Sequence, residues 1–321
     1  MALAPEIIER IKQLEEKYAA MGQDLTSYLD GLLYADYLTY WDYINLDTLL
    51  SLQNPRTSFP DEEIFIMYHQ ITELYFKLCL HEMKQISDLE KPDAAFLTAR
   101  VTRINRYFEA LTKSFDIMVQ GMEKEQFLKF RMSLLPASGF QSAQYRTIEI
   151  YATDFIRLVH KDKRDTFTSD YSKEDIPKMF EHIYWKEGAT ELSSGKKTLT
   201  LRQFEIKYSK KLIETAQQNM NTNIWKQFTA IPENERSEDL INAIKWLDVN
   251  VNINWPLVHY KSAVRYLQQN PNDIAATGGT NWQKYLPPRF QKRIFYPEIW
   301  SEKEMDEWGK SWVESVLAEK K

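Results

Sequence analysis

The chain has 321 residues, of which 43% are hydrophobic and 13% aromatic, so it is long enough to bury a large core. Its 41 basic and 46 acidic residues give a formal charge of -5 and include no basic block, which argues against a nucleic-acid partner. The single cysteine, Cys79, excludes an intrachain disulfide and any multi-cysteine metal site.

Targeting and membrane signals are absent from the sequence pattern. The first residues, MALAPEIIERIKQLEEKY, become charged within six positions, unlike a signal peptide. No stretch approaches the roughly 18 apolar residues of a membrane span. We therefore expect a cytoplasmic protein that does not enter a membrane.

Helical periodicity begins at the N-terminus. Pro5 to Met21 carries apolar residues at helical spacing between mostly charged positions. We expect residues 1–45 to form an arm that packs on a neighbouring subunit. After the aromatic-rich segment 25–53, the Pro55 and Pro60 loop precedes a nearly apolar helix over 61–87, whose first turn is acidic, as the helix dipole favours.

Further helices are predicted along the rest of the chain. Their expected ranges are 93–121, 124–134, from about 142 to 159, 176–184, 202–219, 221–229, 237–249, 254–269 and 301–320. A short strand competes with helix only in KTLTLRQF, where we favour helix. The scarcity of glycine, 9 residues, also favours long helices. The predicted fold class is all-α, with one domain over 1–321 built from about ten to twelve helices and long loops.

Three aromatic and polar pairs with i, i+4 spacing are the main functional signal. They are Phe65/His69, Phe127/Arg131 and Trp255/His259. This spacing puts both members of a pair on one helical face. If the three faces converge, they supply a neutral imidazole for a metal, a second imidazole, a fixed cation and an aromatic wall.

Each polar member also has an ordinary structural interpretation. We expect Asn254 to cap a helix with Pro256 in its first turn, so that the dipole keeps His259 neutral; a hydrogen-bonded core histidine is the alternative. The apolar setting of Arg131 favours a bound carboxylate, and a buried ion pair is equally compatible. His69 and Glu73 form half of a carboxylate metal motif or a plain surface hydrogen bond. The glycines of ATGGT suit a lid over a ligand.

Several segments together closely resemble the tryptophan 2,3-dioxygenase family of haem enzymes. They are FPDEEIFIMYHQITELYFKL, FLKFRMSLLPASGFQSAQYR, WPLVHYKSAV and ATGGT, with YLTYWDYINLDTLLSLQ upstream. They occur in the order typical of that family, and the resemblance can be followed from Tyr34 to Trp300. The chain departs from the family at Pro60, where a histidine is usual, and through a longer stretch between His259 and Thr277.

The resemblance implies one haem b per subunit with His259 as its proximal ligand. Trp255 would pack near the haem. His69 corresponds to the distal, catalytic histidine that hydrogen-bonds the indole N–H, and Phe65 lines the substrate pocket. Arg131 corresponds to the clamp on the substrate carboxylate.

Other implied contacts lie on loops and on the N-terminal segment. Phe127 would be an aromatic wall of the pocket, and Arg146 a partner of a haem propionate. The remaining correspondences are Ser138 and Gly139 over the distal haem face, Thr277 at the substrate ammonium and carboxylate, and Tyr40, Tyr43 and Ile44 in a neighbouring subunit's pocket. The last three imply a homotetramer.

The implied activity is the opening of the indole ring of L-tryptophan with O2 to give N-formyl-L-kynurenine. Three alternatives remain open from the sequence. They are a related haem-dependent monooxygenase acting on tryptophan or a derivative, a non-catalytic haem or tryptophan sensor, and a structural helical adaptor.

Overall fold

The fold was analysed in a computed structural model that describes residues 3–36, 38–134, 141–187, 189, 196–267 and 292–309. The chain forms two compact units, Met1–Asn54 and Pro55–Lys321. Each unit is described by itself. The prediction of a single domain with an arm over 1–45 remains a prediction.

The N-terminal unit contains α1 (Pro5–Ala20), α2 (Leu25–Leu33), α3 (Tyr40–Tyr43) and α4 (Leu46–Leu50). Asp24 caps α2 by accepting a hydrogen bond from the backbone N–H of Thr26. None of these four helices buries a residue fully. The unit therefore has little core of its own.

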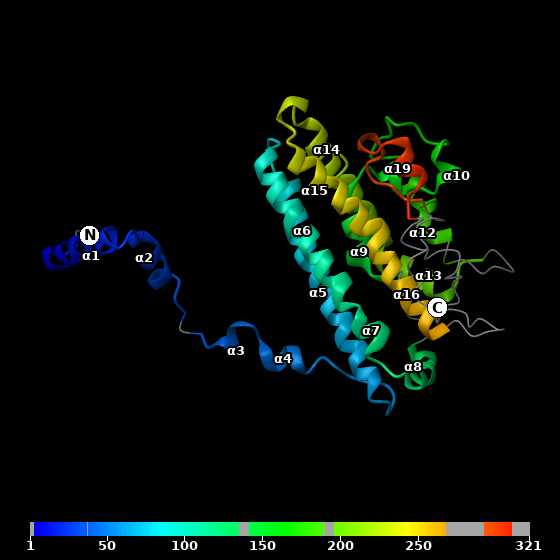
Figure 1. The fold of residues 1–321 in the computed structure, drawn as a ribbon, viewed down its shortest axis with the longest axis horizontal. Helices are drawn as coiled ribbons and strands as arrows, with labels where there is room; N and C mark the ends of the chain where they lie inside the picture. The colour runs from blue at the N-terminus through cyan, green and yellow to red at the C-terminus, as the bar shows by residue number, and fades with distance from the viewer. Residues whose placement is uncertain are drawn as a thin grey trace. The chain divides into compact units, whose positions relative to one another are not determined.

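The larger unit is built around long helices (Figure 1). The elements that form its centre are α5 (Asp61–Ser87), α6 (Ala94–Ser114), α9 (Ala143–Ala152), α13 (Leu199–Gln218) and α15 (Glu238–Val249). α5 packs against both α6 and α9, α15 packs against α6, and α13 against α9. The core lies between these helices, with Met83, Phe108 and Ile148 each fully enclosed.

Shorter elements connect and cover this centre. They are α7 (Asp116–Gln120), α8 (Lys124–Phe130), η1 (Arg131–Leu134), η3 (Phe155–Leu158), α10 (Lys161–Arg164), α11 (Ile176–Glu181), α12 (Tyr184–Glu187), α14 (Ile224–Ala230), η4 (Glu233–Glu235), η5 (Asn250–Asn254), α16 (Trp255–Leu267), η6 (Pro297–Ile299) and α19 (Glu302–Asp306). The described ranges contain no strand, and an isolated bridge pairs Val159 with Ile183. The predicted all-α class is confirmed, and KTLTLRQF leads into α13 as predicted.

Polar residues immediately before the helices explain where many of them begin. A side-chain oxygen accepts a hydrogen bond from the first turn of α6, α9, α13, α14 and α15. The capping residues are Asp93, Ser142, Thr198, Asn223 and Ser237. The starts predicted at 93 and 237 match these caps, whereas α13 and α14 begin at Leu199 and Ile224 rather than at the predicted 202 and 221.

Two predicted helices end earlier than expected. The helix expected over 93–121 breaks at Phe115, whose ring packs against Tyr68 and Trp255. The helix expected to reach about residue 159 ends at Ala152, because Thr153 adopts an extended conformation. The Thr153 hydroxyl donates to the Phe295 carbonyl instead.

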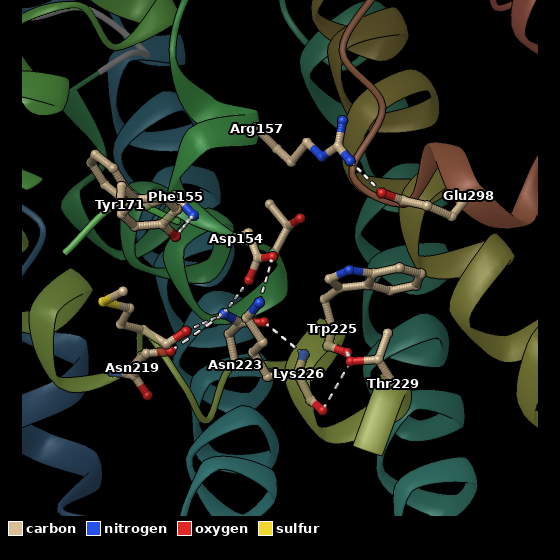
Figure 2. A network of polar contacts seen from close by, with 12 residues as sticks. Asp154, Phe155, Arg157, Tyr171, Asn219, Asn223, Trp225, Lys226, Thr229 and Glu298 are labelled. Carbon is tan, nitrogen blue, oxygen red and sulfur yellow. Dashed lines mark hydrogen bonds and ion pairs between the residues drawn. The ribbon is translucent and has the colours of Figure 1, made fainter. Parts of the chain in front are cut away.

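The polar network in Figure 2 joins the end of α9 to α14. Asn223 caps α14 and donates from its amide to the Asp154 carboxylate at 3.1 Å. Lys226 pairs with the same carboxylate at 3.0 Å. Arg157 forms an ion pair with Glu298 in the C-terminal segment. These contacts fix the chain where it leaves α9.

The predicted helix start at Asn254 is wrong. α15 continues into α16 through the π-helical turn η5, so no helix N-terminus lies near His259. The Asn254 amide donates to Asn250 rather than capping a helix. Pro256 has no N–H for the carbonyl four residues earlier, and a widened turn before it accommodates that loss.

The structure contains no membrane-spanning candidate within the ranges it describes, because none of those helices is both long and apolar enough. The predicted C-terminal helix over 301–320 is described only through α19. The ATGGT loop lies outside the described residues.

Candidate functional site

Three helical segments carry the predicted site. α5 holds Phe65 and His69, α8 with the following turn η1 holds Phe127 and Arg131, and α16 holds His259. α8 packs against both α5 and α16, which brings the segments together. The Phe65 ring lies 4.1 Å from the His69 ring and 6.2 Å from the Phe127 ring, measured between centroids.

His259 lies in an aromatic cage. The centroid of its ring is 4.4 Å from Trp255 and 4.6 Å from Phe115. Its Nδ1 lies 2.9 Å from the Trp255 carbonyl oxygen. A carbonyl can only accept, so Nδ1 carries the proton and the Nε2 lone pair is left for a metal.

Burial explains why this imidazole is neutral. It lowers the pKa of His259 to about 4, although the Trp255 carbonyl bond opposes that change, and nearby His69 lowers it further. The predicted neutrality therefore holds, but its cause is dehydration rather than the predicted helix dipole.

His69 has the same tautomer by the same argument. Its Nδ1 donates to the Phe65 carbonyl at 2.7 Å, so Nε2 is a hydrogen-bond acceptor. The His69 side chain is exposed on α5. The protein around the ring disfavours its charged form and lowers the pKa of His69. The neighbouring Glu73 accepts a hydrogen bond from Gln144 at 2.7 Å.

Arg131 is only 4% exposed, and burial lowers its pKa. A guanidinium remains charged in a protein even so. Its position directly after α8 places a buried positive charge one turn beyond Phe127. Both predicted interpretations, a ligand carboxylate and a buried ion pair, remain compatible with this position.

Arg146 lies in a buried polar cluster. Its guanidinium donates to Glu149 at 2.8 Å and to the Tyr184 hydroxyl at 2.7 Å. Glu149 outweighs burial, which acts in the opposite direction, and raises the pKa of Arg146. Arg293 is the second guanidinium on Glu149, at 3.3 Å. Two cations sharing one carboxylate make this cluster suitable for an additional anion.

The remaining predicted site residues lie outside the described ranges or in the other compact unit. Ser138, Gly139 and Thr277 lie outside the described residues. Tyr40 and Tyr43 belong to the N-terminal unit, where they are 70% and 75% exposed, and Ile44 follows them.

Sequence reasoning missed several residues that shape the site. Phe115 packs on His259, and Phe130 lies 5.7 Å from Phe65. Tyr266 lies 4.7 Å from Phe127. Tyr266 follows His259 by about two helical turns, a spacing that could have identified it, whereas no local pattern marks Phe115.

Comparisons with known proteins identify the family of the chain. A family model described as tryptophan 2,3-dioxygenase matches residues 31–259. The chain belongs to the tryptophan 2,3-dioxygenase family. The matched range includes all three aromatic and polar pairs and ends at His259, so Thr277 lies beyond it. The predicted enzyme class, a tryptophan dioxygenase, is confirmed, and the alternatives are not favoured.

Individual relatives carry the same name. A tryptophan 2,3-dioxygenase of Bacillus thuringiensis subsp. konkukian is 29% identical over 275 residues, covering 82% of this chain and 91% of the relative. One from Ruegeria sp. is 39% identical over 117 residues, covering 36% of this chain and 42% of the relative. One from Bradyrhizobium sp. is 40% identical over 113 residues, covering 35% and 40% respectively.

Proposed function

We propose that this protein is a haem-dependent dioxygenase that converts L-tryptophan and O2 to N-formyl-L-kynurenine. The observation that carries the proposal is the packing of α8 against α5 and α16. It groups the segments that carry two neutral imidazoles, His69 and His259, and the buried guanidinium of Arg131. Family membership supports the same reaction.

The donor set around His259 fits haem b. A neutral imidazole whose Nδ1–H is held by a backbone carbonyl presents Nε2 in a fixed direction, as an axial iron ligand requires. Phe115 and Trp255 supply flat apolar surface beside that nitrogen. Arg146 would meet a propionate, and Ser138 and Gly139 would lie over the distal face.

The protein contributes a two-point grip on the substrate. Arg131 binds the carboxylate through paired charge-assisted hydrogen bonds. The Nε2 acceptor of His69 receives the indole N–H, while Phe65 and Phe127 enclose the ring. Because the grip holds both ends of tryptophan, it fixes the C2–C3 bond in one orientation.

Haem iron supplies the oxygen activation when it is bound. The residues around it orient the indole, hold its N–H proton at His69 Nε2 and exclude water. Both oxygen atoms enter the product, as the C2–C3 bond breaks to give a formyl and a ketone group.

Further parts of the proposal concern residues that lie elsewhere. Thr277 would meet the substrate ammonium and carboxylate. Tyr40, Tyr43 and Ile44 would line the pocket of a neighbouring subunit in a homotetramer. We also propose a cytoplasmic location.

The test is product analysis after incubation of the haem-loaded protein with tryptophan and ¹⁸O2. We expect a product that gains two heavy oxygen atoms and absorbs as N-formylkynurenine. One added oxygen would indicate the monooxygenase alternative, and no turnover by protein that retains haem would indicate the sensor. His259→Ala is expected to lose haem retention, with His81→Ala, an exposed histidine on α5, as the matched control.

A further inference from the structure

The first turn of α8 depends on contacts from other helices. α8 has no side-chain cap of its own, because Glu123 at the capping position makes no such bond. Instead, the Asp61 carboxylate at the start of α5 accepts a hydrogen bond from the Glu123 backbone N–H at 2.6 Å. In return, the Gln126 side-chain oxygen accepts from the Asp61 backbone N–H at 3.2 Å. The starts of α5 and α8 are thus bonded reciprocally.

The same spacing then repeats on both helices. Phe65 and His69 follow Asp61 by four and eight residues, and Phe127 and Arg131 follow Glu123 by four and eight residues. Residues four apart lie on one face of a helix. Because Asp61 is bonded to Glu123, the next residues in each series meet, and the Phe65 and Phe127 rings are 6.2 Å apart. The last residues of the two series, His69 and Arg131, hold the two ends of tryptophan in the proposed function.

A second tether joins this region to α16. The buried Tyr266 hydroxyl lies 3.2 Å from the carbonyl oxygens of Val119 and Met122, in the turn that leads into α8. Its ring packs on Phe127 at 4.7 Å. α16 also carries His259, so the turn before α8 is fixed to both histidine-bearing helices.

We infer that Asp61 is a positioning residue for tryptophan binding, which sets the register of the Phe127 and Arg131 segment against Phe65 and His69. The inference rests on the proposed function, because it names what holds the proposed grip in place. Asp61 touches no substrate and acts through α8.

The proposed effect of Asp61 depends on a hydrogen bond from the Glu123 backbone to its buried carboxylate. Asp61 is 8% exposed, so water replaces its bond to Glu123 poorly once the carboxylate is removed. A hydrogen bond to a charged group contributes more to stability than a bond between neutral groups. A binding group displaced by about 1 Å can lower the reaction rate about 100-fold. Loss of the bond lets α8 shift while the rest of the core stays packed.

The neighbouring Glu62 provides a matched control. It is fully buried on the same helical turn, but its carboxylate accepts from the backbone N–H groups of Arg56 and Thr57, at 2.8 and 2.7 Å. The Glu62 carboxylate therefore anchors the preceding loop, whereas the Asp61 carboxylate bonds to the start of α8. Removal of the Glu62 carboxylate should destabilise the start of α5 and leave the alignment of α8 against α5 unchanged.

The experiment compares Asp61→Ala, Asp61→Asn and Glu62→Ala in the haem-loaded full chain. It measures KM and kcat for tryptophan, tryptophan affinity by calorimetry, haem absorption and unfolding by urea. For Asp61→Ala we expect KM and Kd to rise about tenfold, the loss of one charge-assisted bond, with an unchanged haem spectrum. Asp61→Asn keeps an acceptor oxygen and should raise KM about threefold. Glu62→Ala should lower stability and leave KM unchanged.

Two results would overturn the inference. One is an unchanged KM and Kd in folded Asp61→Ala; the other is an equal rise in Glu62→Ala, which would mean a merely structural role. If Asp61→Ala does not fold, an unchanged KM in folded Asp61→Asn overturns it as well. Failure of the wild-type protein to oxidise tryptophan would instead refute the proposed function, and the calorimetric comparison would still test Asp61.

Discussion

His69 and His259 make the same hydrogen bond on two different helices. Each ring donates from Nδ1 to the carbonyl four residues earlier and leaves Nε2 as an acceptor. Their surroundings differ, because His259 lies between Phe115 and Trp255, whereas His69 keeps accessible surface. The same residue type therefore suits an iron ligand in one place and a substrate contact in the other.

Arg131 is the residue whose loss should affect tryptophan affinity most. Arg131→Met keeps an unbranched side chain and removes the guanidinium. We expect KM for tryptophan to rise about 100-fold or more, because paired charge-assisted hydrogen bonds are lost. Steady-state kinetics measures this.

Lys129→Met is the control for that change. It removes one positive charge two residues away, from an exposed position. KM should remain within about twofold, because exposed charges contribute little. Equal effects of the two substitutions would show that overall charge, rather than a specific clamp, governs binding.

The spacing of the three pairs was sufficient to predict most of the described site residues. The i, i+4 pattern identifies which side chains share a face, and α5, α8 and α16 do meet. Phe115 could not be predicted, because it reaches His259 from a helix break about 140 residues earlier in the chain. The bond between Asp61 and Glu123 is equally non-local, so the acidic first turn of α5 suggested only a dipole effect.

At the scale of elements, the start of α5 should respond to pH through Glu62. Burial alone would raise the pKa of Glu62, but hydrogen bonds from Thr57 and from the Arg56 backbone outweigh it, and the pKa is lowered from 4.5. A carboxyl with a lowered folded pKa stabilises the fold above its unfolded pKa and loses that contribution as the pH falls through the folded value.

We therefore expect Glu62→Gln to lower the free energy of unfolding near pH 7 and to have a smaller effect as the pH falls through the lowered pKa of Glu62, where the native carboxyl becomes protonated. Urea unfolding at a series of pH values measures the difference between the two proteins. A difference that does not change with pH would contradict the assignment.

The turn between α7 and α8 requires glycine. A Cβ at Gly121 would lie 2.6 Å from the Ile117 carbonyl oxygen, which belongs to the backbone and cannot rotate away. Gly121→Ala should therefore destabilise the larger unit by about 1–3 kcal/mol, as overpacking does. Denaturant unfolding measures this. Gly31→Ala on α2 is the control, since nothing lies within 4 Å of its added Cβ, and no loss of stability is expected there.

The boundaries of α5 were predictable without a side-chain cap. It begins at Asp61 after Pro60 and ends at Ser87, as the proline, the acidic first turn and the apolar pattern predicted. The start of α16 was mispredicted because Asn254 and Pro256 resemble an N-terminus, while the π turn carries the helix through both. A sequence pattern cannot distinguish these cases when the preceding helix has the same apolar face.

At the scale of the whole molecule, the N-terminal unit exposes more apolar surface than an isolated segment tolerates. Leu33, Trp41 and Tyr43 are 74%, 56% and 75% exposed. Several large apolar side chains exposed within one short segment are typical of interaction sites. This agrees with the proposed homotetramer.

We predict that the full chain forms a tetramer in solution and that Trp41→Ser with Tyr43→Ser weakens it. Light scattering coupled to size-exclusion chromatography measures the mass. Ile206→Ser on α13, where the side chain is 87% exposed, is the control and should not alter assembly. A monomeric wild-type chain, or an unaffected double variant, would refute the prediction.

The widened turn at Asn250–Asn254 holds one more residue than an α-helical turn closes over. Each residue advances an α-helix by roughly 100°. Deleting a single amino acid there would thus rotate His259, the proposed haem ligand, by roughly a quarter-turn about the helix axis while α15 stays packed on α6. An insertion or deletion of one residue in this π-helical turn would change the orientation of His259. Such changes should therefore be far less tolerated here during evolution than in surface loops.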